Sequence, residues 1–132
     1  MAKLITLLAL LWASVASAEA PMTGAEFDEY ATGRTLSFGT IGNPDYGVEQ
    51  YLPGRDVIWS PAPDICIEGV WFEQDGDICF LYENDPEAKC WKVYRTETGI
   101  RAEFTNRPGT TVLFESTDLE KPLTCPGPDL LG

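Results

Sequence analysis

The chain has 132 residues, 44% of them hydrophobic, and it carries 21 acidic against 9 basic side chains for a formal net charge of −12. An acidic surface argues against nucleic acid and anionic membranes as partners, because both are bound through lysine and arginine. The chain contains no histidine, which excludes a Ser-His-Asp triad and removes the usual ligand of zinc, copper and non-haem iron. We therefore expect neither a cofactor nor a metal site.

The first 18 residues have the pattern of a secretory signal peptide. Lys3 is followed by the apolar run 4–15, and Ala16-Ser17-Ala18 matches a signal-peptidase site. The apolar run is too short to span a bilayer, and no second hydrophobic stretch follows it. We predict a signal peptide at 1–18, a single β-rich domain at 19–132, and a periplasmic or secreted protein with no membrane span.

A short helix is predicted at the start of this domain. Thr23 is followed three residues later by Glu26, which fits a capping box, and Gly33 is placed to end the helix. We expect the helix at 24–31 to cover one end of a barrel or one face of a sheet.

Short β-like segments separated by Gly, Asn and Pro follow the helix. We predict strands at Arg34–Gly39, Gly47–Leu52, Arg55–Ser60, Ile65–Glu73, Asp77–Glu83, Lys89–Glu97, Ile100–Asn106 and Thr110–Glu115. The spacing predicts an all-β fold, an antiparallel meander of about eight strands that forms a closed or nearly closed barrel, with two packed sheets as the alternative.

The turns between strands predict which side chains share a face. A two-residue turn at 75–76 pairs Trp71 with Phe80, and the loop that follows sets Cys79 opposite Cys90. Since side chains alternate along a strand, this register puts the large apolar side chains of neighbouring strands on the same face.

The same reasoning extends to the last hairpins. A two-residue turn at 98–99 pairs Val93 with Phe104, and Val112 and Phe114 join the apolar face if a bulge or longer turn precedes them. The predicted core face holds Ile65, Ile67, Gly69, Trp71, Ile78, Phe80, Tyr82, Trp91, Val93, Ile100, Ala102 and Phe104.

Four cysteines in an exported protein favour disulfides. The register predicts a Cys79–Cys90 bridge between neighbouring strands, which leaves Cys66 for Cys125 and ties the C-terminal tail to the sheet. The competing interpretations are a zinc site and a reactive thiol, but no pair has the C-x-x-C spacing typical of a four-cysteine zinc site.

Aromatic side chains are numerous on the predicted core face. Trp71, Phe80, Trp91 and Phe104 would line an apolar ligand pocket if the barrel is hollow, as the interiors of some small barrels are. The alternative, which we weigh more heavily, is a solid core filled by the same side chains.

The acidic residues give no catalytic pattern. The turns 75–77 and 84–87 lack the spacing of a calcium loop and are better explained as solvated turns. Glu49 and Glu68 are the most strand-like acids, yet nothing in the sequence marks either as catalytic. We expect a protein that is not an enzyme, with a hydrolase built on two carboxylates as the least favoured hypothesis.

One part of the chain has a recognisable likeness. Through Gly69-Val70-Trp71, Cys79-Phe80 and Cys90-Trp91 the chain resembles small secreted bacterial proteins of unknown function and calycin or lipocalin-like β-barrels. Lipocalins carry Gly-x-Trp on their first strand, whereas here it falls in the middle of the meander. The resemblance implies a packing role for Gly69 and Trp71.

Two functions follow as expectations. The first is an exported, disulfide-bonded interaction or structural protein without catalysis, whose acidic surface meets a cationic protein. The alternative is a carrier of a small apolar ligand in a calycin-like barrel. A cavity lined by the four aromatic residues favours the carrier, and a filled interior with a flat exposed patch of Phe72, Leu81 and Tyr94 favours the interaction protein.

Overall fold

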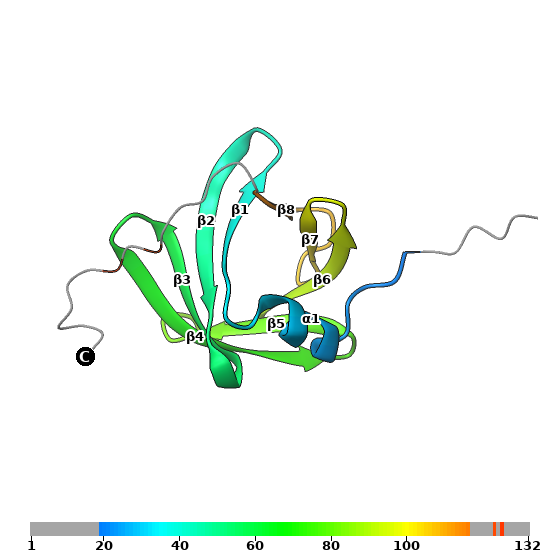
Figure 1. Ribbon diagram of the computed structural model, residues 1–132, viewed down its shortest axis with the longest axis horizontal. Coiled ribbons are helices and arrows are strands. Elements are labelled where there is room, and N and C mark those ends of the chain that lie inside the picture. Colours follow the sequence, from blue (N-terminus) through cyan, green and yellow to red (C-terminus); the bar gives the residue numbers. More distant parts are fainter. Residues whose placement is uncertain (1–18, 117–122, 124, 126–132) are drawn as a thin grey trace, which may run out of the picture.

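The computed structural model describes residues 19–116 together with Leu123 and Cys125; the predicted signal peptide at 1–18 and most of the C-terminal tail lie outside the described residues. Eight strands follow one another in chain order around a closed barrel (Figure 1). Each strand is antiparallel to the next, and the last strand pairs back with the first. The predicted all-β barrel with one short helix is therefore confirmed.

The strand boundaries differ from the prediction mainly at the second strand. The observed strands are β1 (Thr35–Thr40), β2 (Asn43–Tyr51), β3 (Asp56–Ala62), β4 (Ile65–Gln74), β5 (Asp77–Tyr82), β6 (Lys89–Thr96), β7 (Gly99–Phe104) and β8 (Val112–Glu115). β2 begins four positions before the predicted Gly47, because Thr40 pairs with Asn43 across a tight turn in which Gly42 has φ +86°. Glycine adopts this conformation without the steric cost of a side chain.

The helix α1 (Gly24–Ala31) forms at the predicted position and closes one end of the barrel (Figure 1). Both halves of the capping box are present, with the Thr23 hydroxyl accepting from the Glu26 N–H and the Glu26 carboxylate accepting from the Thr23 N–H. Phe27 is buried beneath the helix, and its ring lies edge-on to the rings of Tyr51 and Trp71 at 5.5 and 5.0 Å. These contacts anchor α1 to the barrel interior.

The hairpin register is confirmed for two of the three predicted hairpins. Trp71 pairs with Phe80 across β4 and β5, and Cys79 pairs with Cys90 across β5 and β6. In the third hairpin the predicted pairing of Val93 with Phe104 is wrong.

In that third hairpin Val93 pairs with Ala102, because the turn lies at 97–98 and Thr96 pairs with Gly99. Gly99 has φ +140°, which lets the strand start directly after the turn. The register therefore moves by two positions, and a shift of two leaves every side chain on its predicted face.

The last strand departs from the prediction in which face it buries. Leu113 points into the barrel and is 6% exposed, whereas Phe114 is 37% exposed, because Ala102 pairs with Leu113 without the expected bulge. The placement of Val112 and Phe114 on the core face was therefore wrong. Ile65, also predicted in the core, is 48% exposed, since it lies at the barrel end where the β3–β4 register shifts before Ala62.

Both predicted disulfides are present. Cys79–Cys90 joins β5 to β6, and Cys66–Cys125 ties residue 125 to β4. Within the described part of the chain, no helix is long and apolar enough to cross a membrane. Gly69 allows close packing against β5, because a side chain there would approach the Leu81 carbonyl oxygen to 2.7 Å.

Candidate functional site

The barrel is hollow. A cavity of about 380 Å³ occupies its interior and reaches the end opposite α1, where side chains of β2, the β5–β6 loop and the β7–β8 loop form the rim. The side chains around it are mostly apolar. They are Phe27, Phe38, Tyr46, Glu49, Tyr51, Trp59, Ile67, Phe80, Tyr82, Asn84, Asp85, Lys89, Trp91, Val93, Ile100, Ala102, Phe104, Thr111 and Leu113.

Three of the four aromatic residues predicted for a ligand pocket line this cavity. Phe80, Trp91 and Phe104 contribute to its wall, with the rings of Trp91 and Phe104 only 4.9 Å apart. Trp71 does not line the cavity. It lies at the closed end against Phe27 of α1, with the Arg55 guanidinium 4.3 Å from its ring centre.

Glu49 is a buried acidic side chain in the wall of the cavity. Its register partners are Leu36 on β1 and Trp59 on β3, so its side chain points inward with theirs, and it is only 4% exposed. The hydroxyls of Tyr82 and Tyr51 both hydrogen-bond to its carboxyl group. The site therefore joins a carboxyl group and two phenols in otherwise apolar surroundings.

Burial controls the ionisation of this group. Removal from water raises the pKa of Glu49 to about 8, although the hydrogen bonds from Tyr82 and Tyr51 act in the opposite direction. Burial and the nearby Glu49 charge also raise the pKa of both tyrosines. At neutral pH the Glu49 carboxyl is thus mainly protonated and the phenols are neutral.

From the sequence, Glu49 was identified as a strand-like acid but was not predicted to line the pocket. The signal was available in the alternation of β2, where Gly47, Glu49 and Tyr51 share one face. Glu68, the other strand-like acid, is exposed on β4 and does not line the cavity.

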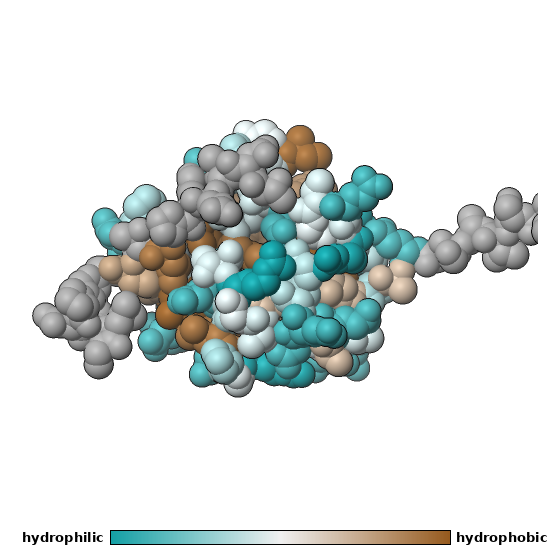
Figure 2. Space-filling view, viewed as in Figure 1, coloured by the Kyte–Doolittle hydropathy of each residue, from teal (hydrophilic) through white to brown (hydrophobic). Residues whose placement is uncertain are grey.

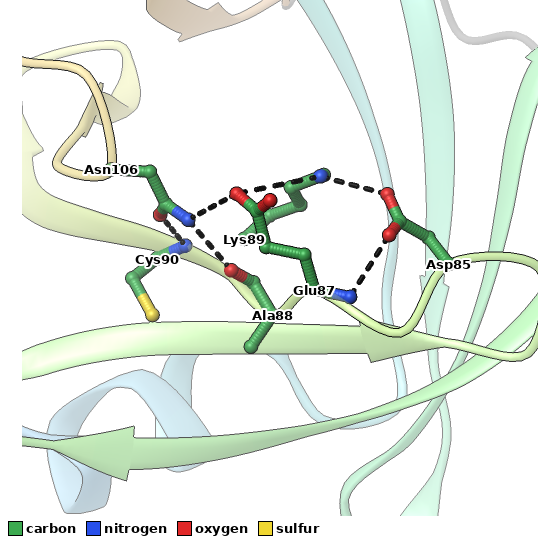
Figure 3. Close-up of polar contacts among 6 residues, drawn as sticks. All are labelled: Asp85, Glu87, Ala88, Lys89, Cys90 and Asn106. Atoms are coloured by element: carbon green, nitrogen blue, oxygen red, sulfur yellow. Dashed lines mark hydrogen bonds and ion pairs between the residues drawn. The ribbon is translucent and has the colours of Figure 1, made fainter.

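A polar network holds the rim (Figure 3). The side-chain amide of Asn106 donates to the Ala88 carbonyl at 2.8 Å, and its oxygen accepts from the Cys90 N–H at 2.8 Å. Asp85 pairs with Lys89 at 2.8 Å and accepts from the Glu87 N–H at 2.9 Å. The network connects the β5–β6 loop to the loop after β7.

Acidic side chains in these turns form ion pairs and hydrogen bonds within the protein. Asp77 is half-buried, pairs with Lys92 at 2.8 Å and accepts from the Thr105 hydroxyl at 2.9 Å. Among residues 19–116, 123 and 125, no group of three His, Cys, Asp or Glu side chains is placed to hold a metal ion.

The three residues of the outer wall whose flat exposed patch would favour an interaction protein are not all exposed. Leu81 is exposed, but Phe72 and Tyr94 are half-buried, and the Arg101 guanidinium lies 4.6 Å from the Tyr94 ring centre. Apolar surface gathers instead on the side of β3 and β4, where Val70 is exposed (Figure 2).

The resemblance to calycin-like barrels remains a prediction, since the barrel topology alone does not identify a family. Comparison of this chain with models of known protein families, with curated proteins and with solved structures finds no match.

Proposed function

We propose that the protein binds a small, largely apolar ligand inside its barrel, without catalysing a reaction. The observation that carries this proposal is the cavity of about 380 Å³, which falls within the range of small-molecule sites. An engineered cavity of about 150 Å³ already holds a benzene molecule, so this volume suits a ligand of roughly two aromatic rings.

Several features favour a carrier over an interaction protein. The interior holds space that a purely structural core would fill, because protein cores are normally packed as densely as organic crystals. Phe72 and Tyr94 are half-buried, so the exposed patch that would favour an interaction protein is not fully formed.

The acids of the wall support binding over hydrolysis. Among the described residues around the cavity, the acids are Glu49 and Asp85, and Asp85 is engaged by Lys89 at the rim. A hydrolase built on two carboxylates needs both of them at the reacting bond.

A fluorescent apolar probe tests the proposal. N-phenyl-1-naphthylamine, which is uncharged at neutral pH, should bind in a saturable 1:1 complex with increased emission. Ala102 lines the cavity on β7, so Ala102→Phe should fill it and lower the probe affinity at least tenfold. Val70→Phe, at an exposed position of β4, is the matched control and should leave the affinity unchanged.

Both variants are first compared with the wild-type protein by near-ultraviolet circular dichroism and thermal unfolding, so that loss of fold is separated from loss of space. A wild-type protein that binds no probe, or two variants that bind it equally, would contradict the proposal. Mass spectrometry of protein purified under native conditions would then identify a co-purifying ligand.

A further inference from the structure

Among the residues that the structure describes, no basic side chain contacts Glu49. Its hydrogen-bonding partners within the described part of the chain are the neutral hydroxyls of Tyr82 and Tyr51. The one basic side chain among the described lining residues is Lys89, which is held at the rim by Asp85 at 2.8 Å. The ionised form of a buried carboxyl group is costly without a positive counterpart, so free Glu49 is mainly protonated at neutral pH, and a ligand that brings a positive charge stabilises the ionised form.

The surroundings favour a cation in other ways. The rings of Trp59 and Tyr82 form part of the wall, and aromatic faces attract ammonium groups. The chain has a net charge of −12, so its field draws small cations toward the molecule. An anionic ligand would be repelled by this acidic field and could not form an ion pair with Glu49.

We propose that the ligand is a hydrophobic amine, with its apolar body in the barrel and its ammonium group paired with Glu49. This inference rests on the proposed ligand-binding function and specifies the chemical class of the ligand. Tyr82 and Tyr51 position the carboxyl group, and the apolar wall selects against amines that lack a hydrophobic body.

The proton balance gives this pairing a signature. An alkyl amine has a pKa near that of lysine, roughly 10, so it arrives protonated at neutral pH. The free Glu49 carboxyl is mainly protonated at pH 7, and it must lose its proton to water before it pairs with the ammonium group. About one proton is therefore released per amine bound at pH 6 and 7, and about half a proton at pH 8, so the affinity should rise about tenfold from pH 6 to 7 and about fivefold from pH 7 to 8.

Tyr51 and Tyr82, the titratable groups that hydrogen-bond to Glu49, do not produce this signature. The neighbouring side chains on the other elements do not titrate; they are Leu36 on β1, Trp59 on β3 and Phe27 on α1. The titratable and charged groups that face this region are Tyr46, Tyr51, Tyr82, Asp85, Lys89 and Glu115. The raised pKa of Tyr51 and Tyr82 keeps both phenols neutral through pH 8.

Three naphthalene probes of similar size test the proposal: 2-(2-naphthyl)ethylamine, 2-(2-naphthyl)ethanol and 2-naphthylacetate. Titration calorimetry at pH 6, 7 and 8, in two buffers of different ionisation enthalpy, gives both the affinity and the protons released. At pH 8 we expect the amine to bind at least tenfold more tightly than the alcohol, and the acetate to bind most weakly.

Glu49→Gln keeps the shape of the side chain and removes the charge, so it should abolish the preference for the amine and the proton release. Glu68→Gln removes a carboxylate from the exposed face of β4 and should change neither. The wild-type pH series provides an independent test if Glu49→Gln folds poorly.

The outcomes separate this inference from the proposed function. If the alcohol or the acetate binds as tightly as the amine, the amine proposal is overturned and the ligand-binding function stands. If none of the three probes nor the neutral N-phenyl-1-naphthylamine binds, both are overturned.

Discussion

Replacing Glu49 with glutamine should remove most of the pH dependence of folding stability between pH 5 and 8. The pKa of this carboxyl is about 8 in the folded protein against an ordinary value of 4.5, so the folded state binds the proton more tightly than the unfolded state. The stability from this group is thus fully present below pH 4.5 and is lost as the pH rises through 8. The free energy of unfolding should fall by about 1.4 kcal/mol per pH unit, or about 4 kcal/mol between pH 5 and 8.

The composition makes the measurement clean, because the chain has no histidine, the side chain that normally titrates in this range. Urea unfolding followed by tryptophan fluorescence at pH 5, 6, 7 and 8 gives the free energy of unfolding with the disulfides intact. The wild-type and Glu68→Gln proteins should lose stability steadily across the series, whereas Glu49→Gln should give a nearly flat profile. Parallel profiles for all three proteins would refute the assignment of a neutral, buried Glu49.

Three further predictions concern stability. Thr23→Ala removes the hydroxyl half of the capping box and should lower the free energy of unfolding by about 1 kcal/mol, measured by urea unfolding; no change would mean that α1 is held by Phe27 packing alone. Replacing both Cys79 and Cys90 with alanine should cost about 3 kcal/mol by the loop-entropy model, and a denaturation midpoint equal to wild type would contradict that cost. Gly69→Ala should cost roughly 2 kcal/mol, because its new methyl group meets the Leu81 carbonyl oxygen and backbone cannot move aside as a flexible side chain can; an unchanged melting temperature would show that the strands separate easily there.

The fold was predictable because its signals are local. Turn residues recur between short apolar segments, and the capping box at Thr23 and Glu26 marks the helix. The disulfide pairing followed from one hairpin, since Cys79 and Cys90 fall opposite each other once the 84–87 loop sets the register of β5 and β6.

The site was less predictable because it depends on how the strands close. Neither the cavity volume nor the burial of Glu49 can be inferred from a single strand, because both depend on side chains from strands far apart in the sequence. The errors at Val112 and Phe114 have the same origin, because the register of β8 is set by its pairing with both β7 and β1. Trp71 was placed in the pocket from its face alone, and its depth along the barrel axis put it under α1 instead.

Under the proposed ligand-binding function, the Asn106 network has a consequence for how fast the ligand exchanges. Since α1 covers one end of the barrel, the proposed ligand would enter and leave at the other end, beside the loops that Asn106 connects. Asn106 does not line the cavity, but it would affect the residence time of the ligand, because loops that are held together slow both binding and release. Weakening the Asn106 hydrogen bonds would speed ligand exchange and leave the residues that line the cavity unchanged.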